Sequence, residues 1–314
     1  MRSTNYLAAL VLFLMPAISV ELLSGNTPLA IYLNPMTFVT LNVVYGGALL
    51  LIRETVVRWG KGFASMLVLA TGYGMVNEAL GSKGFFDPHF YSAVEFRLEG
   101  FGRWFGINVP WALDISIFHA VFSILVPLVI VSAIFTGNER WIGNKLYAAL
   151  LIALVAVTAF VFKHFSLPPY YYHYNEGLGP ISLIIALLAL AILAAWKMPA
   201  IAFAKWRIRL NALALFFIGA VYLLAYVILP NIVRTVTNSP PLYESFLLVF
   251  FVALPILLVL KLPEPTGRGK VALAAGLLAP VIAQSAANSR LIPAAIVLAL
   301  IVIAWLRSAP TGTW

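Results

Sequence analysis

The sequence predicts an all-α fold, a polytopic integral membrane bundle of about ten transmembrane helices. Of its 314 residues, 62% are hydrophobic and only 10% are charged, whereas a soluble domain carries about 25% charged residues. Apolar runs close to the ~20 residues that cross a bilayer as a helix recur along the whole chain. These runs are continuous and do not alternate residue by residue, which favours helices over a membrane barrel.

We expect one transmembrane domain over residues 1–314, with spans near 5–22, 36–53, 62–80, 109–134, 146–163, 178–196, 208–230, 241–260, 270–288 and 291–306. The first run resembles a signal peptide, but it lacks a small-x-small cleavage site and has Pro16 and Glu21 near its end. We therefore interpret it as a span. Only Ser289 and Arg290 separate the last two runs, which leaves open two full helices or one re-entrant unit.

The charges of the loops predict the orientation, because cytoplasmic loops carry an excess of Lys and Arg. Most basic residues should lie on one side of the membrane: Arg2, Arg53, Arg58, Lys61, Arg140, Lys145, Lys197, Lys205, Arg207, Arg209, Lys261, Arg268, Lys270 and Arg307. We therefore expect a multi-pass protein of the cell membrane, in contact with the lipid bilayer, with both termini in the cytoplasm. The net charge of +9 then reflects topology, and a nucleic-acid partner is not indicated.

Several kinds of chemistry are excluded by what the sequence lacks. It contains no cysteine, which rules out disulfides, thiolate metal sites and a cysteine nucleophile. It also has no His-Glu-x-x-His zinc motif, no Gly-x-Ser-x-Gly elbow, no Walker loop and no dinucleotide-binding glycine pattern. The sequence therefore assigns no cofactor and no set of metal ligands.

Glu78 lies within an apolar segment, and an ionisable side chain there is a candidate functional residue because lipid solvates charge poorly. At helical spacing, Ala70 and Gly74 share its face, and small residues let another helix approach closely. Glu78 should then face protein, with Asn77 beside it and Lys83 just over one turn beyond. The alternative is a carboxylate at the membrane boundary that pairs with the lysine for packing or topology.

His119 should lie near the middle of the span expected at 109–134, which makes it the deeper of the two ionisable residues. Pro110 suits the first turn of that helix. Ser123 shares a face with His119 by its four-residue spacing. Asp114 is five residues away, about 140° around the helix, so the two need not touch. The alternative is that His119 is a packing residue with satisfied hydrogen bonds.

Two long connections on the outer side carry aromatic and polar residues. The connection 81–108 combines many aromatic side chains with charges, Arg103 among them, which is typical of the membrane interface. It could act as a lid. In the Tyr/His-rich connection 163–177, His164 and His173 could point into a shared outer vestibule. The alternative for both connections is an ordinary aromatic belt.

Three short patterns carry a resemblance to a known family: Asn77-Glu78 with Lys83, Phe160-x-x-x-His164, and His119-x-x-x-Ser123. They resemble motifs of the CPBP (CaaX protease and bacteriocin-processing) intramembrane protease superfamily. That family carries Glu-Glu-x-x-x-Arg, Phe-x-x-x-His and His-x-x-x-Asn on separate membrane helices. This chain departs from the family in its Asn-Glu pair, its lysine and its final serine.

The resemblance implies an intramembrane hydrolase with three catalytic residues. Glu78 would act as general base on a water, while His119 and His164 would hold a metal ion or polarise a carbonyl. The connection 81–108 would control access to the site.

Two other classes of function compete with a hydrolase. Ten spans with both termini inside match the gross plan of secondary transporters of the drug/metabolite type, and five spans per half would give the inverted halves that such transporters require. A structural or assembly subunit would use the same polar groups to hold helices together. For an unknown small-molecule or peptide substrate, we expect contacts from Asn77, Lys83, Arg103, Asp114 and Ser123.

Overall fold

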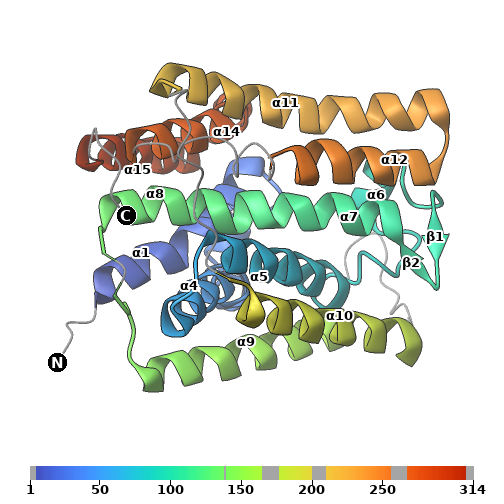
Figure 1. Cartoon of the computed structure of the whole chain (residues 1–314), viewed down its shortest axis with the longest axis horizontal. Coiled ribbons are helices and arrows are strands. Elements are labelled where there is room, and N and C mark those ends of the chain that lie inside the picture. The colour runs from blue at the N-terminus through green and yellow to red at the C-terminus, as the bar shows by residue number, and fades with distance from the viewer. Residues whose placement is uncertain (1–4, 138, 165–176, 200–209, 256–266, 309–314) are drawn as a thin grey trace.

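The structure of the chain is a computed structural model that describes residues 5–137, 139–164, 177–199, 210–255 and 267–308. Figure 1 shows long helices lying side by side, most of them along the longest axis of the molecule. A two-stranded hairpin lies at one end of this bundle (Figure 1).

The helices include several π-helical segments, written η. Up to residue 134 the elements are α1 (Tyr6–Ala17), η1 (Ile18–Leu22), α2 (Leu29–Tyr32), α3 (Pro35–Leu41), η2 (Asn42–Gly47), α4 (Ala48–Trp59), α5 (Phe63–Val76), η3 (Asn77–Gly81), α6 (Tyr91–Glu95), β1 (Arg103–Trp104), β2 (Ile107–Asn108), α7 (Val109–Phe118), η4 (His119–Leu125) and α8 (Val126–Ile134). The later elements are α9 (Asn144–His164), α10 (Leu178–Lys197), α11 (Ala212–Thr237), α12 (Pro240–Phe246), η5 (Leu247–Ala253), α14 (Gly267–Ala287) and α15 (Leu291–Arg307).

Asparagine side chains mark where several of these helices begin. Asn5, Asn34, Asn108 and Asn211 each accept a hydrogen bond from a backbone N–H in the first turn of the helix that follows. Such a bond satisfies an N–H group that has no partner within the helix. Proline follows Asn34 and Asn108 within two positions, where its missing N–H costs no helical bond.

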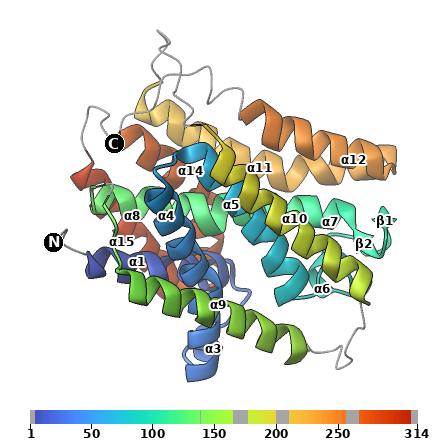
Figure 2. The same ribbon diagram turned by 60° about the horizontal axis from the view of Figure 1, so that its bottom comes forward.

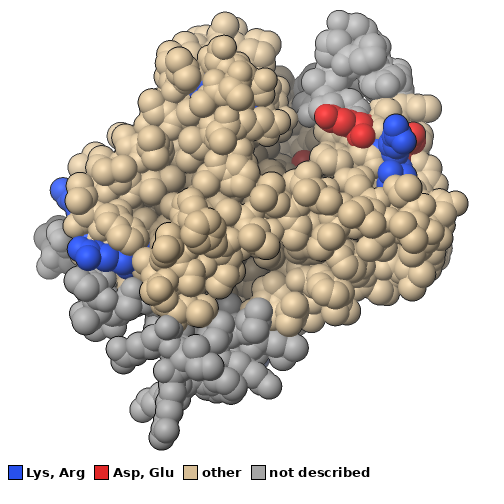
Figure 3. Space-filling view, turned by 90° about the horizontal axis from the view of Figure 1, so that it is seen from above, with Lys and Arg blue, Asp and Glu red and all other residues tan. Residues whose placement is uncertain are grey.

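Within the described residues, six helices are long and apolar enough to cross a membrane: Pro35–Trp59, Val109–Ile134, Asn144–Phe162, Leu178–Lys197, Ala212–Thr237 and Gly267–Ala287. Shorter apolar helices accompany them at Tyr6–Leu22, Pro240–Ala253 and Leu291–Arg307. Figure 3 shows a broad uncharged surface on one face, with charged side chains toward its two ends. This agrees with the all-α membrane class that the sequence predicts.

The last two apolar runs form separate helices, α14 and α15, which pack against each other. Ser289 turns the chain between them with a left-handed backbone (φ 61°). Residues 165–176 of the Tyr/His-rich connection, His173 among them, lie outside the described residues. So do parts of the runs expected at 208–230 and 241–260.

Glycines allow several helices to approach backbone to backbone. A Cβ atom at Gly276 on α14 would overlap the carbonyl oxygen of Phe216 on α11, and one at Gly219 would overlap that of Leu273. Small residues at helix contacts are a main source of association in membranes, where apolar side chains gain little from leaving lipid. The packing of α11 on α14 therefore depends on these two glycines.

We predict that Gly276→Ala destabilises the protein by about 1–3 kcal/mol, because the added methyl group forces the two helices apart. Thermal unfolding of the purified chain in detergent measures this. Gly179→Ala is the matched control, since Gly179 is also helical and its Cβ would meet nothing within 4 Å. Equal melting temperatures for the two variants would contradict the prediction.

Arg53 and Glu54 are buried, at the end of the span that the sequence predicts near 36–53. The helix continues beyond that range, because α4 ends at Trp59, and the exposed fractions are 4% for Arg53 and 0% for Glu54. The Glu54 carboxylate pairs with Arg53 and Arg58 and accepts the backbone N–H of Trp141. The connection after α8 thus folds back onto α4 and compensates the buried charges.

We predict that Glu54→Gln destabilises the protein by about 3–5 kcal/mol, because two guanidinium groups lose their buried counter-charge. Denaturant unfolding in detergent measures the change. Glu139→Gln lies in the same connection but is exposed, so it should change stability by no more than about 0.5 kcal/mol. A similar loss of stability in both variants would contradict the stabilising role of the buried Glu54 carboxylate.

Candidate functional site

Glu78 and His119 meet in the interior of the bundle. Nε2 of His119 lies 3.0 Å from Oε1 of Glu78, and the exposed fractions of the two residues are 2% and 8%. Glu78 comes from η3, at the end of the helix that begins with α5. His119 begins η4, partway along the helix formed by α7, η4 and α8. The pair therefore joins two separate helices of the bundle.

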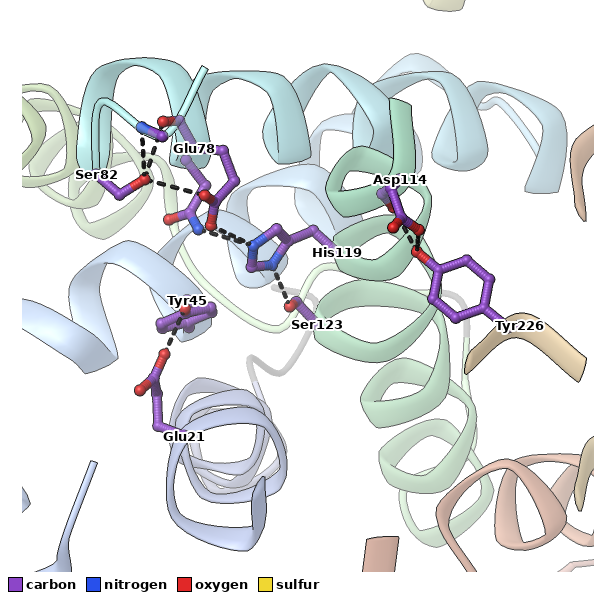
Figure 4. A network of polar contacts seen from close by, with 10 residues as sticks. Glu21, Tyr45, Glu78, Ser82, Asp114, His119, Ser123 and Tyr226 are labelled. Carbon is purple, nitrogen blue, oxygen red and sulfur yellow. Dashed lines mark hydrogen bonds and ion pairs between the residues drawn. The ribbon is translucent and has the colours of Figure 1, made fainter. Parts of the chain in front are cut away.

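Two more buried side chains complete the surroundings of the His119 ring. Oγ of Ser123 lies 2.8 Å from Nδ1, and Nδ2 of Asn77 lies 3.1 Å from Nε2. Figure 4 shows Glu78, His119 and Ser123 joined by successive contacts. The structure thus brings together four of the residues that the sequence analysis selects.

Ser82 ties the connection 81–108 to Glu78. Its hydroxyl donates to the backbone oxygen of Glu78 and lies 3.0 Å from Oε2 of the same residue. A Cβ at Gly84 would lie 2.9 Å from Glu78 Oε2, so the chain passes close to this carboxylate. Phe85 and Phe86 then follow as fully buried side chains. The connection therefore packs into the bundle as well as covering its end.

The close approach of α5 to α7 and η4 depends on Gly74. A Cβ there would lie 2.9 Å from the carbonyl oxygen of Ser116 and 3.2 Å from the Cβ of His119. Contacts this short leave no space for a side chain, so the glycine sets how near the two helices lie. Gly74 is one turn before Glu78 on the same helix, and it thereby brings the carboxylate within reach of the imidazole.

A second carboxylate and two tyrosines lie beside this group. Tyr45 donates its hydroxyl proton to Glu21 Oε1 at 2.6 Å, and Thr27 donates to Glu21 Oε2 at 2.7 Å. The rings of Tyr45 and Tyr73 lie 5.9 and 6.0 Å from the His119 ring, centroid to centroid.

Sequence analysis did not assign these residues to the site, although two of them carry a signal. Glu21 is a carboxylate in an apolar run, as Glu78 is. Tyr73 stands four residues before Asn77, on the same helical face. Nothing in the local sequence distinguishes Tyr45.

The helices change from α to π geometry where they supply these side chains. Glu21 lies in η1, Tyr45 in η2, Glu78 in η3 and His119 in η4. Short π-helical segments inside α-helices are rare and occur frequently at functional sites. Four such segments around one polar group favour a functional role over simple packing.

Asp114 lies elsewhere, although the sequence analysis counts it among the substrate contacts. Its carboxylate accepts hydrogen bonds from Tyr226 on α11 and, at 3.1 Å, from Tyr243 on α12. Figure 4 shows Asp114 and Tyr226 apart from the contacts around His119. Asp114 therefore joins α7 to the second half of the chain.

Lys83 and Arg103 make other contacts in the described structure. Nζ of Lys83 lies 4.6 Å from the centre of the Phe162 ring. Arg103, in β1, donates to backbone oxygens of its own connection, including that of Gly106 at 2.7 Å. His164 ends α9, and its side chain lies outside the described residues.

The arrangement is suited to moving or holding a proton. A carboxylate, an imidazole and a hydroxyl stand in sequence at hydrogen-bond distances, each able to accept or release a proton in exchange with its neighbour. Across the described residues, no group of three or more His, Asp or Glu side chains is arranged to hold a metal ion.

The chain matches an uncharacterized membrane protein family over residues 9–312, and it belongs to that family. No curated protein and no solved structure matches it. The family match does not support the resemblance to the CPBP superfamily. It establishes a membrane protein and assigns no activity.

We predict that Tyr226→Phe destabilises the protein by about 1–3 kcal/mol, because a buried carboxylate loses a hydrogen-bond donor. Unfolding of the purified chain measures the loss. Tyr222→Phe is the matched control, one turn earlier on α11. Its hydroxyl donates only to a neutral backbone oxygen at 3.3 Å, so its removal should cost about 1 kcal/mol or less. A larger loss for Tyr222→Phe would contradict this role of Asp114.

Proposed function

We propose that the protein is a proton-driven secondary transporter and that Glu78 and His119 form its proton-binding site. The observation that carries this proposal is the double contact at His119 Nε2, with Glu78 Oε1 at 3.0 Å and Asn77 Nδ2 at 3.1 Å. An imidazole nitrogen makes one such hydrogen bond at a time, either as an N–H donor or as a lone-pair acceptor.

The two neighbours of Nε2 match two different positions of the proton. A protonated Nε2 donates to the Glu78 carboxylate. In this first state Nδ1 is bare and accepts from Ser123. After the pair gains one proton, Glu78 and Nδ1 are both protonated, and the bare Nε2 accepts from the Asn77 amide. Ser123 serves both states at Nδ1, because a hydroxyl can donate or accept. The pair can therefore gain or lose a proton without leaving a buried polar atom unpaired, as proton relays within membranes require.

The helical plan also supports a transporter. We propose ten spans with both termini in the cytoplasm: the six long helices, the three shorter apolar helices, and Phe63–Gly81, which carries Glu78. Five spans per half would place the two halves in opposite orientations, as in transporters built from inverted repeats.

We further propose that the connection 81–108 is the lid of this site. Ser82 contacts the Glu78 carboxylate directly, and the buried rings of Phe85 and Phe86 anchor the next residues in the bundle. A movement of this connection would expose the pair to the outer solution, and its return would close the site again.

A hydrolase is the second candidate, and one observation favours it. Ser123, His119 and Glu78 form a hydroxyl–imidazole–carboxylate chain with contacts of 2.8 and 3.0 Å, the order of groups that activates a serine nucleophile. However, Ser123 is completely buried, so a substrate would reach it only after the helices part. The role of His164 as a third catalytic residue stays a prediction from the sequence.

We predict that Glu78→Gln removes one titrating carboxyl group of the protein. Infrared difference spectra of the purified full chain in lipid nanodiscs, recorded across a pH titration, should lose one protonated-carboxyl band. In proteoliposomes with an imposed pH gradient, Glu78→Gln and His119→Gln should also abolish the proton flux that mixtures of small solutes induce. Glu95→Gln is the control, because Glu95 is exposed in the connection 81–108, and it should keep both signals.

Each competing function predicts a different result. If Glu78 shows no titrating band, and the variants only lower the melting temperature, the pair serves to hold helices together, with a contribution of about 0.6–2 kcal/mol. If the protein hydrolyses esters or peptides and loses that activity in both Ser123→Ala and Glu78→Gln, without any proton flux, the hydrolase is correct.

A further inference from the structure

A groove lies on the surface of the bundle where α4 ends beside α10. Its volume is about 340 Å³, and it is lined by Trp59, Ala189, Ile192, Leu193 and Trp196. The four residues from α10 are exposed, and their spacing of three and four places them on one face of the helix. They form an apolar stripe that runs for about 10 Å along α10.

The two tryptophans of the groove stand at the ends of helices that are long and apolar enough to cross a membrane. Trp59 ends Pro35–Trp59, and Trp196 is the last residue but one of Leu178–Lys197. Because both side chains line one groove, these two helix ends would meet the same surface of a bilayer. Tryptophan is enriched at the level of the lipid headgroups, so we expect this end of the groove to lie there.

Two ammonium groups flank the tryptophan end of the groove. Nζ of Lys61 donates to the backbone oxygen of Met198 at 3.0 Å, and Nζ of Lys197 lies 4.4 Å from the centre of the Trp196 ring. Within the described part of the chain, neither lysine pairs with a carboxylate. An ammonium group has three N–H donors, so both lysines keep donors for an anion.

Arg58, the residue before Trp59, differs from these lysines because the protein compensates its charge. Its guanidinium group pairs with Glu54 at 3.0 Å and donates to the backbone oxygen of Ile142 at 3.1 Å. It also lies over the ring of Tyr147. The positive charge of Lys61 and Lys197 has no such internal counterpart, and it faces the groove from outside the ion pairs of this end.

Contacts between α5 and α10 hold the groove in shape. Oγ of Ser65 donates to the backbone oxygen of Ala195 at 2.8 Å, one residue before Trp196. The bond from Lys61 to Met198 lies two residues after that tryptophan. Figure 2 shows α10 lying against α5, with its last turn near α4. A preformed site loses little conformational freedom when it binds a ligand.

We propose that this groove binds one acidic phospholipid. An acyl chain would lie along the apolar face of α10, and the phosphate would be bound by Lys61 and Lys197 at the tryptophan end. Basic pockets between membrane helices bind lipid headgroups of this kind. A zwitterionic lipid would bring a second cation beside the lysines, and a free phosphate would leave the apolar groove unfilled. The site shares no residue with the proposed proton site.

The test uses the full chain in nanodiscs of phosphatidylcholine with a rising fraction of phosphatidylglycerol whose acyl chains carry bromine, which quenches tryptophan fluorescence on contact. We expect half of the quenching at a lower fraction of brominated phosphatidylglycerol than of brominated phosphatidylcholine. Lys61→Gln and Lys197→Gln should each raise that fraction about fivefold, the contribution of one basic residue near an acidic lipid surface. Trp196→Phe should remove the quenching at low fractions, which locates the signal among the eight tryptophans.

Lys145→Gln is the matched control. Lys145 is exposed in the first turn of α9 and does not line the groove, so its removal should leave the half-quenching fraction unchanged. Lys197 is exposed as well, so Lys197→Gln tests the site even if Lys61→Gln fails to fold.

Three results would overturn the proposal. The first is equal half-quenching fractions of the two lipids in the unchanged protein. The second is an equal shift in Lys145→Gln and Lys197→Gln, since the attraction would then belong to the whole basic end. The third is a second copy of the chain in the groove. The sequence has no cysteine, so Leu193→Cys carries a single thiol, and its oxidation to a disulfide-linked dimer in liposomes would reveal that copy.

Discussion

A polar side chain inside a membrane bundle has to find its partner on another helix, because lipid offers none. The contact between Glu78 and His119 meets this requirement, and much of the surrounding structure serves it. Gly74 removes the side chain that would keep the two helices apart. The carboxylate and the imidazole come from the π-helical segments η3 and η4, and they lie 3.0 Å apart. Ser82 then contacts the same carboxylate from the connection 81–108.

The helix from Val109 to Ile134 joins the parts of the molecule. On one side, His119 and Ser123 face the polar group shared with η3. On another side, Asp114 receives hydroxyl groups from α11 and α12. After α8, the connection back to α4 covers the buried Arg53–Glu54 pair. A displacement of this helix would therefore change contacts in both halves of the chain. The proposed transport mechanism needs such a connection between the halves.

The proposed proton site illustrates how a membrane protein can keep ionisable groups buried at moderate cost. An isolated charge in a medium of low polarity is strongly unfavourable. A carboxylate beside an imidazole has the option of sharing one proton, and Asn77 and Ser123 provide hydrogen bonds for either arrangement. The same contacts could activate a serine nucleophile, so what separates a transporter from a hydrolase is access to Ser123 rather than the chemistry of the pair.

The sequence by itself determined the membrane class and the approximate positions of the apolar helices, and it selected Glu78 and His119 as candidates, because hydropathy and the cost of charge in lipid are local properties. It also placed Asn77 and Ser123 beside them, since neighbours on one helix follow from its period. Only the tertiary structure decided that Glu21 and Tyr45 join this group, that Asp114 leaves it, and that Arg53 and Glu54 are buried. Those contacts join residues far apart in the chain, and no local pattern specifies which helices come to lie side by side.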